Sequence, residues 1–263
     1  MLDALEQAGF LPSLIVAAPD KIARDKTPVF PPEKAWALAH GIEVAQPARL
    51  DDTFRAKLRD ARHDFYIVAS YGKILPAELL AIPRRGVVNL HPSLLPRLRG
   101  PSPIRSAILE DEKEVGVSIM LLDDKMDHGP LIGQKKVTLP ERPMRGRALD
   151  ELLAREGATL LAEALPRWLS GEVEPRAQDH AQATYCKMFS KEDGLLDLAA
   201  DPQQNLRTIR AFEGWPGTYA FFEKNGARIR VNILDAHIER GALVINRVIP
   251  EGKREMTYAD FMR

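Results

Sequence analysis

The chain has 263 residues, which is enough for one sizeable domain and a smaller second one without covalent crosslinks. Its 37 Lys and Arg residues balance 37 Asp and Glu residues, so no net positive charge indicates a nucleic-acid partner, and any such binding has to be local. The single cysteine, Cys186, excludes an internal disulfide and a zinc site of several cysteines, and we expect a structural thiol. Because no apolar run reaches the roughly 18 to 20 residues of a membrane span, we expect a soluble cytoplasmic protein.

Short apolar runs alternate with helical patterns over the first two thirds of the chain. Such alternation is typical of a mostly parallel α/β sheet with crossover helices. The expected elements are, in chain order, a helix over residues 2–8, a strand over 13–18, a loop over 19–32, a helix from 33, a helix over 52–60, strands over 64–69 and 87–91, a helix over 103–110, strands over 115–122 and 131–137, and a long helix over 146–169. Leucines recur at helical spacing along the last helix, and we interpret this stripe as core.

The character of the sequence changes after the long helix. Residues 171–188 are polar and lack periodicity, as a linker does. A short helix over 204–212 follows, with β-type segments over 217–223, 228–234 and 242–248. The sequence therefore predicts a first domain over residues 1–170, a linker over 171–188 and a small, mainly β domain over 189–263.

The stretch VVNLHPSLLPRLRGPSP places Asn89 and His91 at the end of an expected strand. With i and i+2 spacing their side chains point to the same side of the strand, so an amide donor and an imidazole can reach one atom. In a parallel α/β sheet, ligands gather beyond the carboxyl ends of the strands. Spacing alone leaves two interpretations open: a reaction centre, or two side chains that close the strand by hydrogen bonding to the loop.

A second cluster, LLDDKMDHGP, follows another expected strand and places Asp123, Asp124, Asp127 and His128 in a turn. Carboxylates in a turn usually solvate it or bind backbone amides. An Asp beside a His can instead set the tautomer of the imidazole or move a proton through water. No HxH, HExxH or cysteine cluster accompanies these residues, so we expect no catalytic metal.

The run NLHPSLLPRLRGPSP, followed by GVSIMLLDDKMDHGP, resembles the signature of the folate-dependent formyltransferases. That family includes the glycinamide ribonucleotide, methionyl-tRNA and amino-sugar formyltransferases. The resemblance implies a Rossmann-like, mostly parallel sheet and a catalytic trio of Asn89, His91 and Asp127, with Gly129 completing the turn. It also implies a small OB-like β-barrel after the linker, a fold that binds nucleic acids.

Four further segments resemble the methionyl-tRNA branch of the family: YGKILP, KMFSKEDGLLDL, IRAFEGWPG and the loop APDKIARDKTPVFPPEKA. This resemblance implies transfer of a formyl group from 10-formyltetrahydrofolate to methionyl-initiator tRNA in translation initiation. The segment SKEDG argues against the alternative acceptor, a nucleotide-linked amino sugar. A catalytically silent tRNA-binding protein is the third hypothesis, against which the intact trio argues. The sequence carries no signal of oligomeric state.

The resemblance also assigns binding residues. The folate is expected along Ser93, Leu94, Leu95 and Pro96, with Ile74 and Leu75 near its pterin ring; ordinary apolar packing is the alternative. The tRNA is expected at Lys21, Arg24 and Lys26, and the catalytic loop adds Arg97 and Arg99. Phosphate contacts of this kind make binding sensitive to salt, whereas the alternative for such residues is solvent-facing charge.

The chain departs from the family pattern at four places, one of which is the substrate loop, which is one residue shorter than the family form and lacks its glycines. The first strand of the family is absent before MLDALEQAGF, so we expect an upstream start codon or a rearranged sheet, because an internal strand would otherwise leave backbone groups unpaired. Between Ile238 and Gly241 the chain skips one or two strands, which predicts an incomplete barrel. Leu98 replaces the aromatic residue usual in the catalytic loop.

Overall fold

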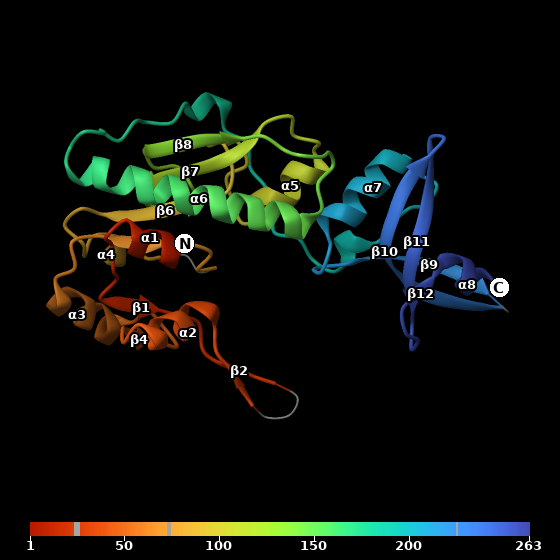
Figure 1. Cartoon of the computed structure of the whole chain (residues 1–263), viewed down its shortest axis with the longest axis horizontal. Coiled ribbons are helices and arrows are strands. Elements are labelled where there is room, and N and C mark those ends of the chain that lie inside the picture. The colour runs from red at the N-terminus through yellow and green to blue at the C-terminus, as the bar shows by residue number, and fades with distance from the viewer. Residues whose placement is uncertain (24–26, 73–74, 225) are drawn as a thin grey trace. The chain divides into compact units, whose positions relative to one another are not determined.

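The computed structural model describes residues 1–23, 27–72, 75–224 and 226–263 (Figure 1). The described residues form two compact units, each with its own hydrophobic core. The first unit consists of Met1–His91, Val117–Lys135 and Ala154–Ala181, and the second of Pro92–Gly116, Lys136–Leu153 and Gln182–Arg263. Among the described helices, none combines the length and apolar character that crossing a membrane requires.

The first unit is built of α/β elements. They are, in chain order, α1 (Leu2–Gln7), β1 (Leu14–Val16), β2 (Lys21–Ile22), β3 (Pro28–Val29), α2 (Pro32–Ala39), β4 (Glu43–Ala45), α3 (Asp52–Ala61), β5 (Tyr66–Val68), α4 (Ala77–Leu80) and β6 (Val87–His91). Most of β7 (Val115–Leu121), β8 (Leu131–Val137) and α6 (Gly146–Leu169) also belongs to it. The long helix has the bounds that its leucine spacing predicts.

A four-stranded sheet with the order β5-β6-β7-β8 carries the main core of this unit. Strand β6 pairs parallel with β5 and antiparallel with β7. Val88 and Ile119 of this sheet pack with Leu161 and Leu165 of α6, and all four are buried. A Cβ atom on Gly157 would lie 2.9 Å from the side chain of Leu90, so this glycine lets α6 approach β6 closely.

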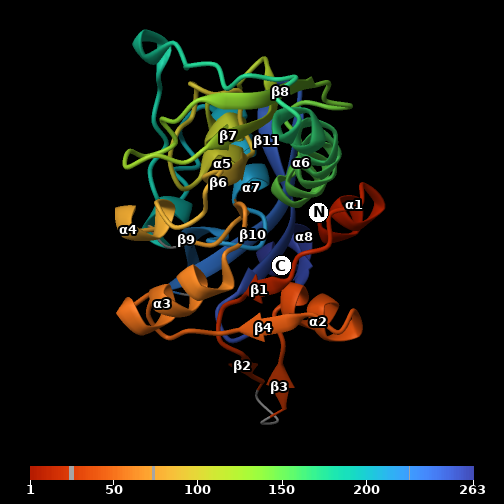
Figure 2. The same ribbon diagram turned by 90° about the vertical axis from the view of Figure 1, so that its left-hand side faces the viewer.

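A separate two-stranded sheet is formed by β1 and β4, which run parallel. Helix α2 packs on this pair (Figure 2), with Ala37 buried against Ile15 and Ala17. In this chain β1 and β5 are both edge strands of their described sheets. The predicted mixed α/β class is confirmed.

The second unit ends in an antiparallel sheet with the order β12-β11-β10-β9. Its elements are α5 (Pro103–Leu109), the 3-10 helix η2 (Glu192–Gly194), α7 (Pro202–Ala211), β9 (Thr218–Lys224), β10 (Ala227–Glu239), β11 (Ala242–Pro250), β12 (Met256–Thr257) and α8 (Tyr258–Met262). A further 3-10 helix, η1 (His180–Gln182), lies in the predicted linker. The prediction of a mainly β second part is confirmed, and the sheet is compatible with a small OB-like barrel.

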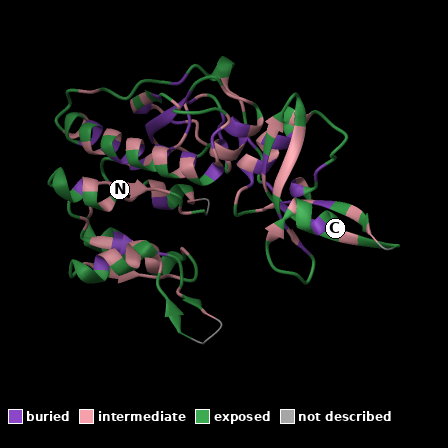
Figure 3. Ribbon diagram, turned by 45° about the vertical axis from the view of Figure 1, so that its right-hand side comes forward, coloured by how far each residue is buried: buried purple, intermediate pink, exposed green. Residues whose placement is uncertain are grey.

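Burial alternates along β10, as a strand with one covered face requires (Figure 3). Val231 and Ile233 are buried against α7 and α8, whereas Arg230 and Asn232 are exposed. Strand β10 passes directly to β11 through a tight turn in which Arg240 and Gly241 both have positive φ, 50° and 82°. This turn lies where the sequence predicts that one or two strands of the barrel are skipped.

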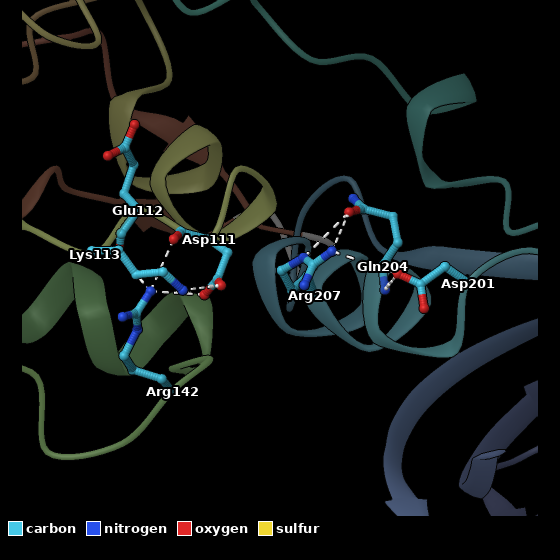
Figure 4. Close-up of polar contacts among 7 residues, drawn as sticks. All are labelled: Asp111, Glu112, Lys113, Arg142, Asp201, Gln204 and Arg207. Atoms are coloured by element: carbon cyan, nitrogen blue, oxygen red, sulfur yellow. Dashed lines mark hydrogen bonds and ion pairs between the residues drawn. The ribbon is translucent and has the colours of Figure 1, made fainter. Parts of the chain in front are cut away.

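A polar network lies around Asp111, after the end of α5 (Figure 4). The carboxylate of Asp111 accepts hydrogen bonds from Lys113 Nζ at 2.6 Å and Arg142 Nη2 at 2.8 Å, and Arg142 also donates to the backbone oxygen of Glu112. The hydrogen bond from Lys113, with the charges of Arg142 and of Arg207 on α7, holds the pKa of Asp111 below its ordinary value. The network therefore stabilises the ionised form of Asp111.

Candidate active site

Strand β6 places Asn89 and His91 on the same face of the first unit's main sheet. Its alternate residues, Val88 and Leu90, face the core that α6 covers, so Asn89 and His91 point to the opposite side. His91 is only 5% exposed and lies opposite Ser118 of β7, whereas Asn89 is half-buried. The sheet itself thus fixes the direction of both side chains.

Asp127 lies in the turn between β7 and β8. Its φ of 47° is in the left-handed region, which an Asp adopts at some cost in free energy. Two residues later, a Cβ atom on Gly129 would lie 1.9 Å from the backbone oxygen of Leu121. Only glycine therefore fits there, and its fit closes the turn directly on the end of β7.

The turn brings Asp127 to His91. Oδ2 of Asp127 lies 3.7 Å from Nδ1 of His91, and both side chains are largely buried. This distance is longer than a hydrogen bond, yet it is in the range of an ion pair and allows a bridging water or a small closure on substrate binding. The structure thus brings together the two titratable members of the trio expected from the sequence, with Asn89 on the same face of β6.

The neighbouring residues of the turn form a second pair. Oδ2 of Asp123 lies 2.6 Å from Nδ1 of His128, and Oδ1 of Asp123 accepts the backbone N–H of Lys125. The ring of His128 stacks on that of His180, with 4.0 Å between ring centroids and 5° between planes. Asp123 therefore serves the turn itself, which is the alternative that the sequence left open for these carboxylates, and Asp124 is exposed.

A linker residue that the sequence did not single out contacts the same turn. Gln178 is 6% exposed, and its Nε2 donates to the backbone oxygens of Asp127 at 2.9 Å and Gly129 at 2.7 Å. Nearby, Arg176 exchanges two backbone hydrogen bonds of 2.8 Å with Leu131 of β8. A polar segment without periodicity gives no sign of burial, so no pattern in the sequence could have predicted this contact.

The residues expected to hold the folate follow His91 directly in the chain. Ser93 and Leu95 are buried, and Ser93 Oγ donates to the backbone oxygen of Arg97 at 2.6 Å. Leu94 and Pro96 are half-buried and keep exposed surface. In the other expected segment Leu75 is half-buried, and Ile74 lies outside the described residues.

The loop expected to bind tRNA is anchored at its base. Asp20 accepts hydrogen bonds from Lys34 Nζ at 2.7 and 2.9 Å and from Gln46 Nε2 at 2.8 Å, and these bonds, first that from Lys34, lower the pKa of Asp20. Lys21 is exposed on β2, which pairs with β3 in a short antiparallel hairpin. Arg24 and Lys26 lie outside the described residues.

The two arginines of the catalytic loop differ in their surroundings. Arg97 is half exposed and forms an ion pair with Glu112. Arg99 is 1% exposed, and its Nη1 donates to the Tyr185 hydroxyl at 3.3 Å. Contact of Arg97 and Arg99 with a phosphate stays a prediction, and Arg97 is the more accessible of the two.

The residues around Arg99 are buried as well. Leu98, which stands where the family has an aromatic residue, is buried with a φ of 55°. The Cys186 N–H donates to the Arg99 backbone oxygen at 2.8 Å, and a Cβ on Gly100 would lie 3.2 Å from Cys186 Sγ. Cys186 is thus the structural thiol that the sequence predicts.

Aromatic and cationic side chains gather on the exposed face of β9 and β10. The guanidinium of Arg228 lies 4.0 Å from the ring centroid of Phe221, and that of Arg230 lies 3.7 Å from that of Tyr219. A cavity of about 990 Å³ beside them is lined by Tyr219, Arg230 and Arg247, among others. The alternation of TYAFF and ARIRVN could have indicated this face, because every second residue is aromatic in one and Arg in the other. Among the described residues, no group of three or more His, Cys, Asp or Glu side chains is arranged to hold a metal ion.

Comparison with known proteins gives a consistent result. Residues 13–165 match a family model described as formyl transferase. A relative from Chloroflexus aggregans, named methionyl-tRNA formyltransferase, is 46% identical over 230 residues, which are 87% of this chain and 74% of the relative. The methionyl-tRNA formyltransferase from Clostridium thermocellum shares the fold with a TM-score of 0.62 at 17% identity, over 90% of this chain and 97% of that protein. HypX from Aquifex aeolicus in complex with tetrahydrofolic acid gives a TM-score of 0.64 at 17% identity, over 86% of this chain and 43% of that protein.

Proposed function

We propose that this chain, which belongs to the formyl transferase family, formylates methionyl-initiator tRNA. Its relative named methionyl-tRNA formyltransferase is 46% identical to it. The formyl donor is 10-formyltetrahydrofolate, and the product serves translation initiation in the cytoplasm. The observation that carries the proposal is the meeting of His91 and Asp127 at 3.7 Å beside Asn89, on one face of β6.

The reaction needs donors at the formyl oxygen. When the α-amine of methionine attacks the formyl carbon, a C–N bond forms and the carbonyl electron pair moves onto the oxygen, which becomes an alkoxide. The side-chain amide of Asn89 and a protonated His91 supply N–H groups from one side of the strand. Each such donor contributes about 3 kcal/mol, judged by the loss of one oxyanion-hole donor in other enzymes.

Two protons also have to move. The attacking amine loses one, and the folate nitrogen that leaves the formyl carbon gains one. Asp127 and His91 form a pair in which the carboxylate accepts a proton and the imidazolium gives one, directly or through a water molecule. The rigid positions of β6 and of the turn closed at Gly129 keep this pair in place during both transfers.

For the co-substrate, we retain Ser93, Leu94, Leu95 and Pro96 as the segment beside the folate, with Ile74 and Leu75 near the pterin. The half-buried Leu94 and Pro96 offer apolar surface to a flat ring, and the buried Ser93 and Leu95 support the backbone of the segment. The segment starts immediately after His91, which favours placing the formyl group near the catalytic side chains.

For the tRNA, we retain Lys21, Arg24 and Lys26, and we add the exposed face of β9 and β10. Cations and aromatic rings together are the combination that binds nucleic acids, through phosphate attraction and base stacking. We also retain the division into a catalytic domain over residues 1–170, a linker over 171–188 and an OB-like domain over 189–263. The second part then supplies nucleic-acid surface, and the first supplies the chemistry.

The direct test is formylation of methionyl-initiator tRNA by the purified chain with 10-formyltetrahydrofolate, in parallel with His91→Ala. We expect formyl-methionyl-tRNA from the unmodified chain and formation at least about 100-fold slower from the variant. A nucleotide-linked amino sugar serves as the second acceptor in the same assay. Transfer to the sugar but not to the tRNA would refute the proposed acceptor, and tRNA binding without any transfer would indicate a silent binding protein.

A further inference from the structure

The amide of Gln178 bridges two carbonyls of the turn that carries Asp127. Its Nε2 donates to the backbone oxygen of Asp127 at 2.9 Å and to that of Gly129 at 2.7 Å. A side-chain amide nitrogen has two hydrogens, so one group can serve both acceptors. Both oxygens belong to the same three-residue stretch, and the side chain of Asp127 extends from one end of it.

This pair of hydrogen bonds lies at a strained position of the backbone. Asp127 has a left-handed φ of 47°, a conformation that a non-glycine residue keeps only when its surroundings enforce it. A fixed carbonyl at Asp127 restricts its ψ and a fixed carbonyl at Gly129 restricts the peptide two residues later. Together they restrict the direction of the Cα–Cβ bond of Asp127, on which the 3.7 Å distance of its carboxylate from His91 depends.

The chemistry of the contact requires a neutral double donor. Gln178 is 6% exposed, and in such a place two carbonyl acceptors without donors are costly. A glutamate at this position offers acceptors only and directs negative charge at two carbonyl oxygens. A methionine fills a similar volume but donates nothing.

We infer that Gln178 is a positioning residue, which acts on catalysis by holding the turn that presents Asp127 to His91. This inference rests on the proposed function. It gives a residue of the predicted linker a role in the reaction, through its two hydrogen bonds to the turn.

The kinetic test compares Gln178→Met and Gln178→Glu with the unmodified chain, using 10-formyltetrahydrofolate and methionyl-initiator tRNA. We expect kcat to fall about 10- to 100-fold, since misplacement of about 1 Å has an effect of this order. The KM for each substrate should stay within about twofold, as expected for loss of an interaction that matters in the transition state. Gln203→Met, at an exposed position on α7, is the matched control and should leave kcat unchanged.

A double-mutant cycle separates positioning from a general structural role. In an Asp127→Asn background, Gln178→Met should change kcat by less than about twofold, because the group that it positions is already lost. An equal fall of kcat in both backgrounds would overturn the inference. A rise in KM alone, with kcat unchanged, would also overturn it.

A readout without substrate distinguishes this inference from the proposed function. In histidine-labelled protein, the imidazole resonances of His91, assigned by their absence in His91→Ala, should move in Gln178→Met in the same direction as in Asp127→Asn. If the unmodified chain formylates nothing but these resonances move together, the proposed function fails and the positioning role stands. If they stay in place in Gln178→Met, the positioning role fails whatever the activity.

Discussion

Nδ1 of His91 lies 3.7 Å from Oδ2 of Asp127, although the two residues come from different elements of the first unit. His91 ends a strand whose other face is packed against α6, and Asp127 lies in a turn closed by a glycine. Their meeting therefore depends on two separate constraints, one from the sheet and one from the turn.

Replacing His91 by Ala removes an oxygen donor and a proton carrier at once. We expect kcat/KM for methionyl-initiator tRNA to fall about 10²- to 10⁴-fold, the range associated with general acid–base groups. The fold should persist, because β6 keeps its backbone pairing with β5 and β7. Circular dichroism and steady-state kinetics check both points. His40→Ala, an exposed His on the end of α2, is the control; a His91→Ala variant with most of the activity would contradict the mechanism.

Replacing Gly129 by Ala tests the turn rather than the chemistry. The new methyl group would lie 1.9 Å from the Leu121 oxygen, so the backbone has to move, and we expect a loss of about 3 kcal/mol in unfolding free energy, at the upper end for overpacking. Urea titration measures it. Gly252→Ala is the comparison, since nothing lies within 4 Å of its Cβ and only its φ of 71° is strained; about 1 kcal/mol is expected there. A Gly129→Ala variant as stable as the unmodified chain would contradict the tight closure of the turn.

The network around Asp111 predicts a stability that depends on pH. Its pKa in the folded chain is below the ordinary 3.8, first because of the Lys113 hydrogen bond. A lowered folded pKa means that the contribution is complete above the unfolded pKa and is lost as the pH falls through the folded one. We expect Asp111→Asn to cost about 0.5 kcal/mol at pH 7, a small figure because the side chain is 37% exposed and screened. The difference between the two proteins should shrink as the pH falls below 3.8 and through the lower folded pKa.

Asparagine is a suitable replacement for testing the contribution of the Asp111 charge. Asn tolerates the left-handed φ of 50° that Asp111 adopts, so the change removes charge without adding backbone strain. Urea titrations at pH 7 and at low pH measure the difference. An Asp111→Asn variant that is more stable than the unmodified chain at pH 7 would show that the carboxylate destabilises the fold.

The exposed face of β9 and β10 predicts a salt-dependent loss of tRNA binding. Arg230→Ala removes one cation from this face, so we expect affinity to fall severalfold and the slope of log K against log salt to decrease by about one. Filter binding over a range of KCl concentrations checks it. Arg59→Ala, an exposed arginine on α3, should leave both the affinity and the slope unchanged, and equal effects of the two variants would contradict a specific face.

Much of the fold could be predicted because long or strongly patterned segments carry their own signal. The helix α6 has the predicted bounds because leucines mark its buried face over many turns. Strand β6 and the residues after it were identifiable through the apolar run and the resemblance of the motif. Some short elements could not be predicted, namely β4, α4, β12 and α8. Each spans few residues, and packing against neighbours rather than a local sequence pattern stabilises it.

Two residues show what the sequence could not reveal about the site. Arg99 appears as one of several basic residues in a polar loop, yet it is 1% exposed and donates to the Tyr185 hydroxyl. Gln178 appears as one polar residue of a linker, yet it is buried against the turn of Asp127. Residue type predicts exposure only on average, so both positions required the structure.

The segment from Arg176 to Cys186 is fastened by backbone hydrogen bonds at each end. Arg176 exchanges them with Leu131, and Cys186 donates to Arg99, which in turn donates to Thr184. A chimaera in which the C-terminal part is exchanged at a crossover before Arg176 would lose these hydrogen bonds together with Gln178. A chimaera joined after Cys186 keeps them all. The C-terminal part can therefore be exchanged without loss of these hydrogen bonds only when the recipient retains residues 176–186.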